Sequence, residues 1–109
     1  PVWEIFPESV IVFPGPDRPI TAEEIEIWGW AWSATGVDRV DVSTDGGASW
    51  HKADVGPRQQ RSWQRFSYRW VPPAAGQYTL MSRATNADGT TQPMDGARNA
   101  VFGVDVTVE

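Results

Sequence analysis

The sequence predicts an antiparallel β-sandwich of about seven strands, and three observations support this fold class. Apolar and polar residues alternate with a period of two in several short runs, which is typical of half-buried strands. Clusters of Gly, Pro, Asn and Asp separate these runs, and no stretch shows a helical period. The 109 residues suit one domain, and seven Trp, four Phe and two Tyr provide apolar area for its core.

Residues 1–19 are expected to form an extended lead-in, because their five prolines oppose both a helix and a central strand. Within this stretch, residues 9–13 could form an edge strand. The chain starts at Pro1 rather than at Met, so we expect a piece of a longer protein. Its upstream domain would precede the lead-in, and residues 20–109 would form the sandwich.

The next strand is predicted over residues 23–32, where alternation is strict. Its small and aliphatic members, Ile25, Ile27, Gly29 and Ala31, fall on one face. Three tryptophans fall on the opposite face. Because both faces are apolar, we expect each to be covered, at least near the end of the strand.

A β-hairpin is predicted over residues 37–53 from its own turn chemistry. The chain reverses at Asp45, Gly46 and Gly47, where the carboxylate can accept backbone hydrogen bonds and the glycines supply positive φ angles. Trp50 opens the return run, and the second arm is expected over residues 49–55.

Three further strands are predicted over residues 62–71, 77–85 and 101–108. In the second of them, Tyr78 stands two residues before the inward position Leu80. This spacing resembles the tyrosine corner of immunoglobulin-type domains, in which antibodies carry cysteine at the inward position. The prediction is therefore an immunoglobulin-like sandwich.

Composition excludes several functions. The net charge is −5 and no run of basic residues could neutralise a phosphate backbone, so we expect no nucleic-acid partner. No apolar run approaches the roughly 20 residues of a membrane span, so we expect a soluble chain without a membrane partner. The sequence has no cysteine, so it can form neither a disulfide nor a thiolate metal site. It does not distinguish periplasm from cytoplasm. A bacterial source is expected.

Catalytic groups are scarce in this sequence. The single histidine, His51, has no second His or Cys to share a metal ion, and a surface role is the simpler interpretation. Asp45 and Asp54 could suggest a pair of hydrolytic carboxylates, but the turn itself requires Asp45. We predict no catalytic, cofactor-binding or metal-ligating residue in this chain.

Trp28, Trp30 and Trp32 share one face of one strand and are the main candidates for binding. Three aligned rings could stack sugars, as in a carbohydrate-binding module. A large apolar patch more often marks a protein interface, and some of the rings could also belong to the core. We favour core or interface and keep sugar binding as the alternative.

The hairpin also resembles the aspartate box of sialidases, Ser-x-Asp-x-Gly-x-Thr/Ser-Trp, through Ser43, Asp45, Gly47, Ser49 and Trp50. In sialidases this box is a structural element that recurs in each propeller blade. One copy occurs here. A fragment of a sialidase-like protein is thus a second alternative, and further boxes in the full gene would favour it.

Several motifs together resemble the C-terminal dimerisation domain of sulfite oxidase and related molybdenum-cofactor oxidoreductases. They occur in the family order from about Glu24 to Val108, and the lead-in resembles the segment that leaves the molybdopterin-binding domain. The motifs are GWAWS, VDVSTDGGASW, Arg83-Ala84-Thr85, Gln92-Pro93 and Asn99-Ala100.

The resemblance implies a non-catalytic association domain of an immunoglobulin-like fold. In this family the module joins two subunits, and the molybdopterin-molybdenum cofactor belongs to the preceding catalytic domain. The expected partners are therefore that upstream domain and a second copy, in a homodimer, with Trp28, Trp30 and Trp32 as interface candidates.

The family also carries an arginine that reaches the substrate pocket from a loop after the Gln-Pro motif. Here only five residues, 94–98, separate Pro93 from Asn99, and Arg98 is the one basic residue among them. An arginine suits an oxyanion because its planar fork binds two oxygens. Arg98 is kept as a candidate pocket contact, although its position does not match the family arginine and a solvated loop charge is the simpler interpretation. Because this loop is much shorter than in the animal and plant members of the family, the sequence does not establish sulfite as the substrate of the parent enzyme.

Overall fold

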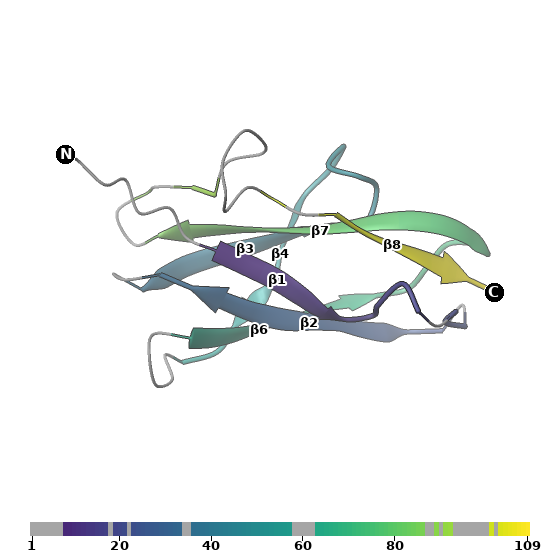
Figure 1. The fold of residues 1–109 in the computed structure, drawn as a ribbon, viewed down its shortest axis with the longest axis horizontal. Coiled ribbons are helices and arrows are strands. Elements are labelled where there is room, and N and C mark those ends of the chain that lie inside the picture. The colour runs from purple at the N-terminus through teal and green to yellow at the C-terminus, as the bar shows by residue number, and fades with distance from the viewer. Residues whose placement is uncertain are drawn as a thin grey trace.

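The computed structural model describes residues 8–17, 19–21, 23–33, 36–57, 63–86, 89, 91–92, 101 and 103–109. Two four-stranded sheets face each other (Figure 1). Sheet A has the order β1 (Glu8–Phe13), β2 (Ile25–Trp32), β6 (Trp63–Trp70) and β5 (Asp54–Val55). Sheet B has the order β4 (His51–Lys52), β3 (Val37–Ser43), β7 (Gly76–Asn86) and β8 (Gly103–Val108). All strand pairs within the sheets are antiparallel.

The strand order confirms the immunoglobulin-like prediction. With β1 to β8 lettered A, B, C, C′, D, E, F and G, sheet A has the order ABED and sheet B the order C′CFG. The tyrosine corner is present at the start of β7, because the Tyr78 hydroxyl donates to the Ala74 carbonyl oxygen at 2.7 Å. Leu80 is fully buried two residues later.

The core lies between the sheets, where the alternation of each long strand places it. Ile27 and Ala31 of β2 are fully buried, and so is Phe66 of β6. Across one end of the sandwich the Trp70 and Tyr78 rings meet edge to face with centroids 5.0 Å apart, which joins sheet A to sheet B. The other buried apolar residues are Ile11, Val37, Val40, Val42, Ala53, Leu80, Ala84, Val106 and Val108.

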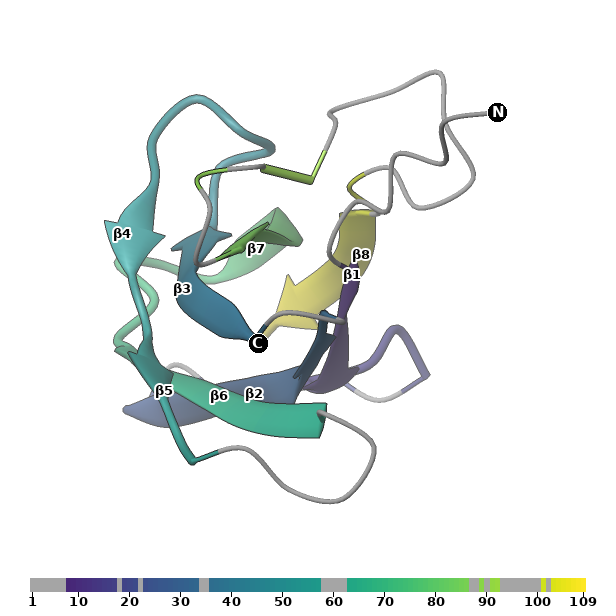
Figure 2. The same cartoon turned by 90° about the vertical axis from the view of Figure 1, so that its left-hand side faces the viewer.

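The second arm of the predicted hairpin is not one strand, which corrects the expectation for residues 49–55. Only β4 pairs with β3, whereas β5 pairs with β6 of the other sheet. Between them Ala53 is buried and its N–H donates to the Val40 carbonyl at 2.8 Å. Figure 2 shows the chain passing from one sheet to the other at this edge. This change of sheet buries Ala53 in the middle of a run that the sequence pattern predicts as a single strand.

The first strand confirms the predicted edge strand and belongs to the sandwich. β1 lies at the edge of sheet A, paired with β2. After it the chain reaches sheet B, where Ile20 forms a parallel bridge with Val108 and its N–H donates to the Thr107 carbonyl at 2.9 Å. The segment between β1 and β2 therefore ties the two sheets on the side opposite β4 and β5.

Two buried glutamines tie separate segments together. The Gln64 side chain accepts from the Val37 N–H at 3.0 Å and donates to the Gly56 carbonyl at 3.1 Å. The Gln92 side-chain oxygen accepts from the Ser9 hydroxyl at 2.7 Å and from the Ala84 N–H at 3.2 Å. Each amide satisfies backbone or side-chain groups that would otherwise be costly to bury.

Gly29 lies where a side chain on β2 would clash with both β1 and β6. A Cβ at this position would fall on the Val10 carbonyl oxygen, 2.8 Å from the Phe66 ring and 2.9 Å from the Ile11 Cα. Because two of these neighbours are backbone atoms, they cannot move aside without shifting β1. The absence of a side chain lets Phe66 pack over β2.

We expect Gly29→Ala to lower the free energy of unfolding by about 1–3 kcal/mol, the usual cost of overpacking a core. Urea unfolding of the two proteins measures this difference. Gly15→Ala is the matched control, since a Cβ there has nothing within 4 Å, and should change stability by less than about 0.5 kcal/mol. Equal stability of the Gly29 variant and the wild type would contradict the close packing described here.

Candidate interaction surface on sheet A

The outer side of sheet A carries the three predicted tryptophans. Trp28, Trp30 and Trp32 project from β2 away from Ile27 and Ala31, and all three are half-buried. The Trp28 and Trp30 rings meet edge to face with centroids 6.4 Å apart. The core explanation for these rings is therefore wrong, because the core is on the other side of the strand.

Neighbouring strands extend this apolar surface. Directly paired residues of antiparallel strands project to the same side. Val10 pairs with Trp30, Phe13 with Trp28, and Trp63 of β6 with Trp32. The exposed fractions of Val10, Phe13 and Trp63 are 48%, 43% and 39%. We call these six side chains the aromatic face: Val10, Phe13, Trp28, Trp30, Trp32 and Trp63.

The sequence prediction missed Val10, Phe13 and Trp63. Trp63 could have been predicted, because residues two apart in a strand face the same side and Trp63 precedes the outward Arg65 by two residues. Val10 and Phe13 depend on the register between β1 and β2, which includes an irregularity between Ile11 and Phe13. That register follows from contacts between distant segments and has no signal in the sequence of β1 alone.

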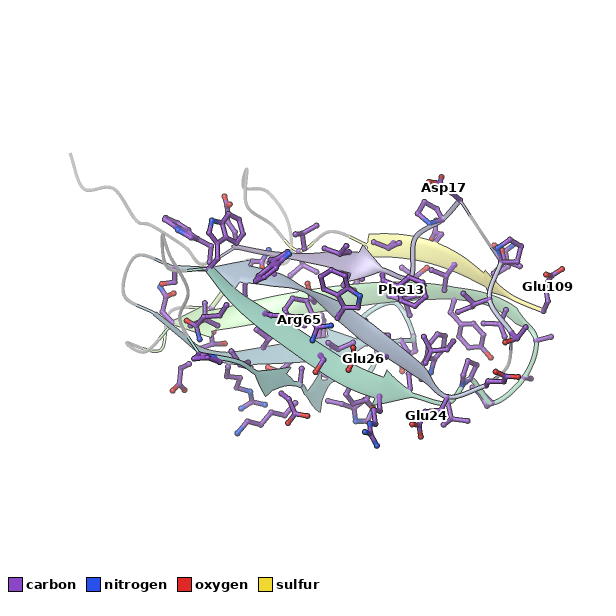
Figure 3. All side chains as sticks on the ribbon, turned by 90° about the horizontal axis from the view of Figure 1, so that it is seen from below. Phe13, Asp17, Glu24, Glu26, Arg65 and Glu109 are labelled. Atoms are coloured by element: carbon purple, nitrogen blue, oxygen red, sulfur yellow. The ribbon has the colours of Figure 1, made fainter. Side chains whose placement is uncertain are left out.

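Arg65 orders the middle of the aromatic face. Its guanidinium lies 4.6 Å from the centroid of the Trp28 ring, and its Nη2 lies 3.0 Å from Glu26 Oε1 (Figure 3). An exposed cation–π contact contributes about 0.5–1 kcal/mol, and the arginine stem covers apolar surface. Arg65 therefore contacts both the Trp28 ring and the Glu26 carboxylate on the outer side of sheet A.

A hollow adjoins one end of the aromatic face, where β2 begins. Apolar side chains and three glutamates line it, and Figure 3 shows Phe13 and Glu24 at this end of the sheet. Arg65 lies 3.0 Å from Glu26 and Arg69 lies 3.9 Å from Glu24, so two basic groups reach these glutamates. We call it the glutamate-rimmed hollow. It shares Phe13 and Trp28 with the aromatic face, and its lining also includes Ile20, Ile25, Glu23, Glu24 and Glu26.

The outer side of sheet B differs, because polar contacts dominate it. Arg39 and Asp41 form an ion pair at 2.8 Å, and the Thr79 hydroxyl donates to Asp105 at 2.7 Å. Met81 is half-buried on this side. The two outer surfaces of the sandwich are thus chemically distinct, and the apolar one is on sheet A.

The predicted turn is a self-contained hydrogen-bonded unit. Asp45 accepts from the Ser49 hydroxyl at 2.6 Å, from the Ser49 N–H at 2.9 Å and from the Ser43 hydroxyl at 2.7 Å. These bonds, that of the Ser49 hydroxyl first, lower the pKa of Asp45 from 3.8 to about 2. Gly46 and Gly47 have φ angles of 72° and 97°, and Trp50 is half-buried directly before β4. Asp45 therefore stabilises the turn.

His51 and Asp54 are not brought into a reactive cluster. The exposed His51 ring stacks on Tyr68 with centroids 5.7 Å apart, at the edge where β4 and β5 join the sheets. Asp54 lies in β5, paired with Ser67. Among the residues that the structure describes, no three His, Cys, Asp or Glu side chains group as a metal site. Arg98 lies outside the described residues, and its role stays a prediction.

The fold and this surface together define a class of protein. An immunoglobulin-like sandwich presents an aromatic outer sheet, with an arginine and a glutamate in contact among its rings. These are the properties of a domain that associates with another protein surface.

The comparisons with known proteins identify the family. Residues 1–107 match the Mo-co oxidoreductase dimerisation domain, and the chain belongs to this family. It is 31% identical over 100 residues to human mitochondrial sulfite oxidase and 30% identical over 100 residues to chicken sulfite oxidase. These alignments cover 84% of this chain but only 18% and 22% of those proteins.

A solved structure agrees with this assignment. The sulfane dehydrogenase SoxCD from Paracoccus pantotrophus superposes with a TM-score of 0.80 at 27% identity, over 99% of this chain and 33% of that chain. The predicted resemblance is confirmed, and the chain is a dimerisation domain of the sulfite-oxidase-like type. The carbohydrate-binding alternative receives no support from these relatives. In the described part of the chain, no helix has the length and apolar character needed to span a membrane.

The low pKa of Asp45 predicts an acid-dependent contribution to stability. Because the folded-state pKa is about 2 and the ordinary value is 3.8, the contribution is present above about pH 4 and is lost as the pH falls toward 2. We expect the difference in melting temperature between wild type and Asp45→Asn to shrink over this range, as measured by circular dichroism. Asp38→Asn controls for a general loss of negative charge. A difference that stays constant from pH 6 to pH 2 would show that the turn does not lower the pKa.

Proposed function

We propose that the aromatic face of sheet A joins two copies of this domain in a homodimer. The observation that carries the proposal is the continuous row of Trp28, Trp30, Trp32 and Trp63 on the outside of a dimerisation domain. Tryptophan and arginine are enriched at the centres of protein interfaces, and a few such residues usually dominate the binding energy.

Size and charge support the same surface. A standard interface buries about 800 Å² on each partner, and a buried aromatic side chain removes roughly 150–250 Å² from solvent. The half-exposed aromatic face can therefore supply the apolar centre of such an interface. Arg69 and the glutamates of the hollow can supply its polar rim.

We further propose that the residues before β1 lead from a catalytic domain that holds the molybdopterin-molybdenum cofactor. The chain has no cysteine, so it offers no thiolate to the metal. The relatives are named sulfite oxidase and sulfane dehydrogenase, which supports oxidation of a reduced sulfur compound by the full-length protein. In this proposal the present domain contributes assembly, and the chemistry belongs to the upstream domain.

Trp30→Ala tests the proposed surface. Truncating an interfacial hot spot costs about 2 kcal/mol or more, so we expect the dimer dissociation constant of the full-length protein to rise roughly 30-fold or more. Sedimentation equilibrium measures the constant. The core should be unaffected, because Trp30 projects from the outside of the sheet.

Met81→Ala is the matched control, since it removes a half-buried apolar side chain from the outside of sheet B. It should leave the dissociation constant unchanged. If Met81→Ala weakened the dimer and Trp30→Ala did not, the interface would lie on sheet B and the proposed surface would be wrong.

A further inference from the structure

The Trp32–Trp63 end of the aromatic face and the glutamate-rimmed hollow lie at opposite ends of β2. Trp32, paired with Trp63, ends β2, whereas Glu24 and Glu26 flank its first residue, Ile25. At about 3.3 Å per residue, the two ends of this eight-residue strand are about 23 Å apart. One end thus presents two indole rings, and the other presents an apolar depression.

We infer that the two copies pack with their β2 strands running in opposite directions, so that Trp32 and Trp63 of each copy enter the glutamate-rimmed hollow of the other. This inference rests on the proposed function. A twofold axis that lies in the plane of the interface, perpendicular to β2 and near its middle, produces this arrangement. The same contact then forms twice, as in any closed twofold dimer.

The chemistry of the two ends is complementary. An indole ring can fill an apolar depression. Its N–H group only donates hydrogen bonds, so a buried indole needs an acceptor nearby. The rim offers carboxylate oxygens, each able to accept several hydrogen bonds. Glu26 can therefore keep its 3.0 Å bond to Arg65 and still accept an indole N–H.

Charge argues against the other twofold packing. An axis running along β2 would place the Glu23, Glu24 and Glu26 end of one copy over the same end of the other. Like charges brought together at an interface are unfavourable, and the chain already carries a net charge of −5. The crossing axis instead separates the two sets of three glutamates by the length of the strand, and it brings only Glu8, which pairs with Trp32, toward the hollow of the other copy.

The test uses two variants of the full-length protein, Trp63→Cys and Glu24→Cys, prepared separately with different affinity tags and then mixed. A short bis-maleimide should link the two variants in the mixture and should not link either variant to itself. Wild-type protein sets the background, and Trp32→Cys replaces Trp63→Cys if that variant fails to fold. A control pair on sheet B, Thr85→Cys with Thr107→Cys, should give no link.

The outcomes separate this inference from the proposed function. A Glu24→Cys variant that links to itself, while light scattering still shows a dimer, would overturn the crossing axis and leave the sheet A dimer intact. A dimer with no link in the mixture would also overturn the inference. Links in the sheet B control pair would overturn both proposals, and wild-type protein that stays monomeric at every concentration would overturn the proposed function.

Discussion

The structure depends on the strict alternation of β2 and on the missing side chain at Gly29. Since successive residues of a strand face opposite sides, burying Ile27 and Ala31 forces the tryptophans outward. Gly29 then allows Phe66 and the backbone of β1 to approach β2 closely. One strand thereby sets both the centre of the core and the centre of the outer surface, so a shift of one residue in its register would exchange the two.

The remaining polar chemistry serves the fold. Gln64 and Gln92 satisfy buried groups from segments far apart in the sequence, and Asp45 is committed to the hydrogen bonds of its own turn. Arg65 differs, because its ion pair and ring contact lie on the outside of sheet A. The arginine and the tryptophans are therefore the groups available to a partner, which agrees with membership of a dimerisation family.

The sequence predicts those features that depend on local patterns. Alternation places the inner and outer residues of β2, and the spacing of Tyr78 to Leu80 correctly indicates the tyrosine corner. The turn at Asp45 also forms as its residues predict, because its bonds join residues within a few positions of each other.

Features that depend on distant contacts escape prediction. The change of sheet at Ala53 requires β5 to pair with β6, and the addition of Val10 and Phe13 to the aromatic face requires one register of β1 on β2. The hollow likewise brings Ile20, Ile25 and Phe13 together only after the chain has crossed between the sheets. Neither alternation nor turn chemistry encodes these pairings.

Hydroxyl-radical footprinting of the full-length protein measures whether the aromatic face is covered in the dimer. Oxidation is compared at protein concentrations above and below the dissociation constant of the dimer. Met81 on sheet B is the internal reference. We expect Trp28, Trp30, Trp32 and Trp63 to be protected in the dimer and Met81 to be oxidised equally in both states. Protection of Met81 with unchanged oxidation of the four tryptophans would contradict this expectation.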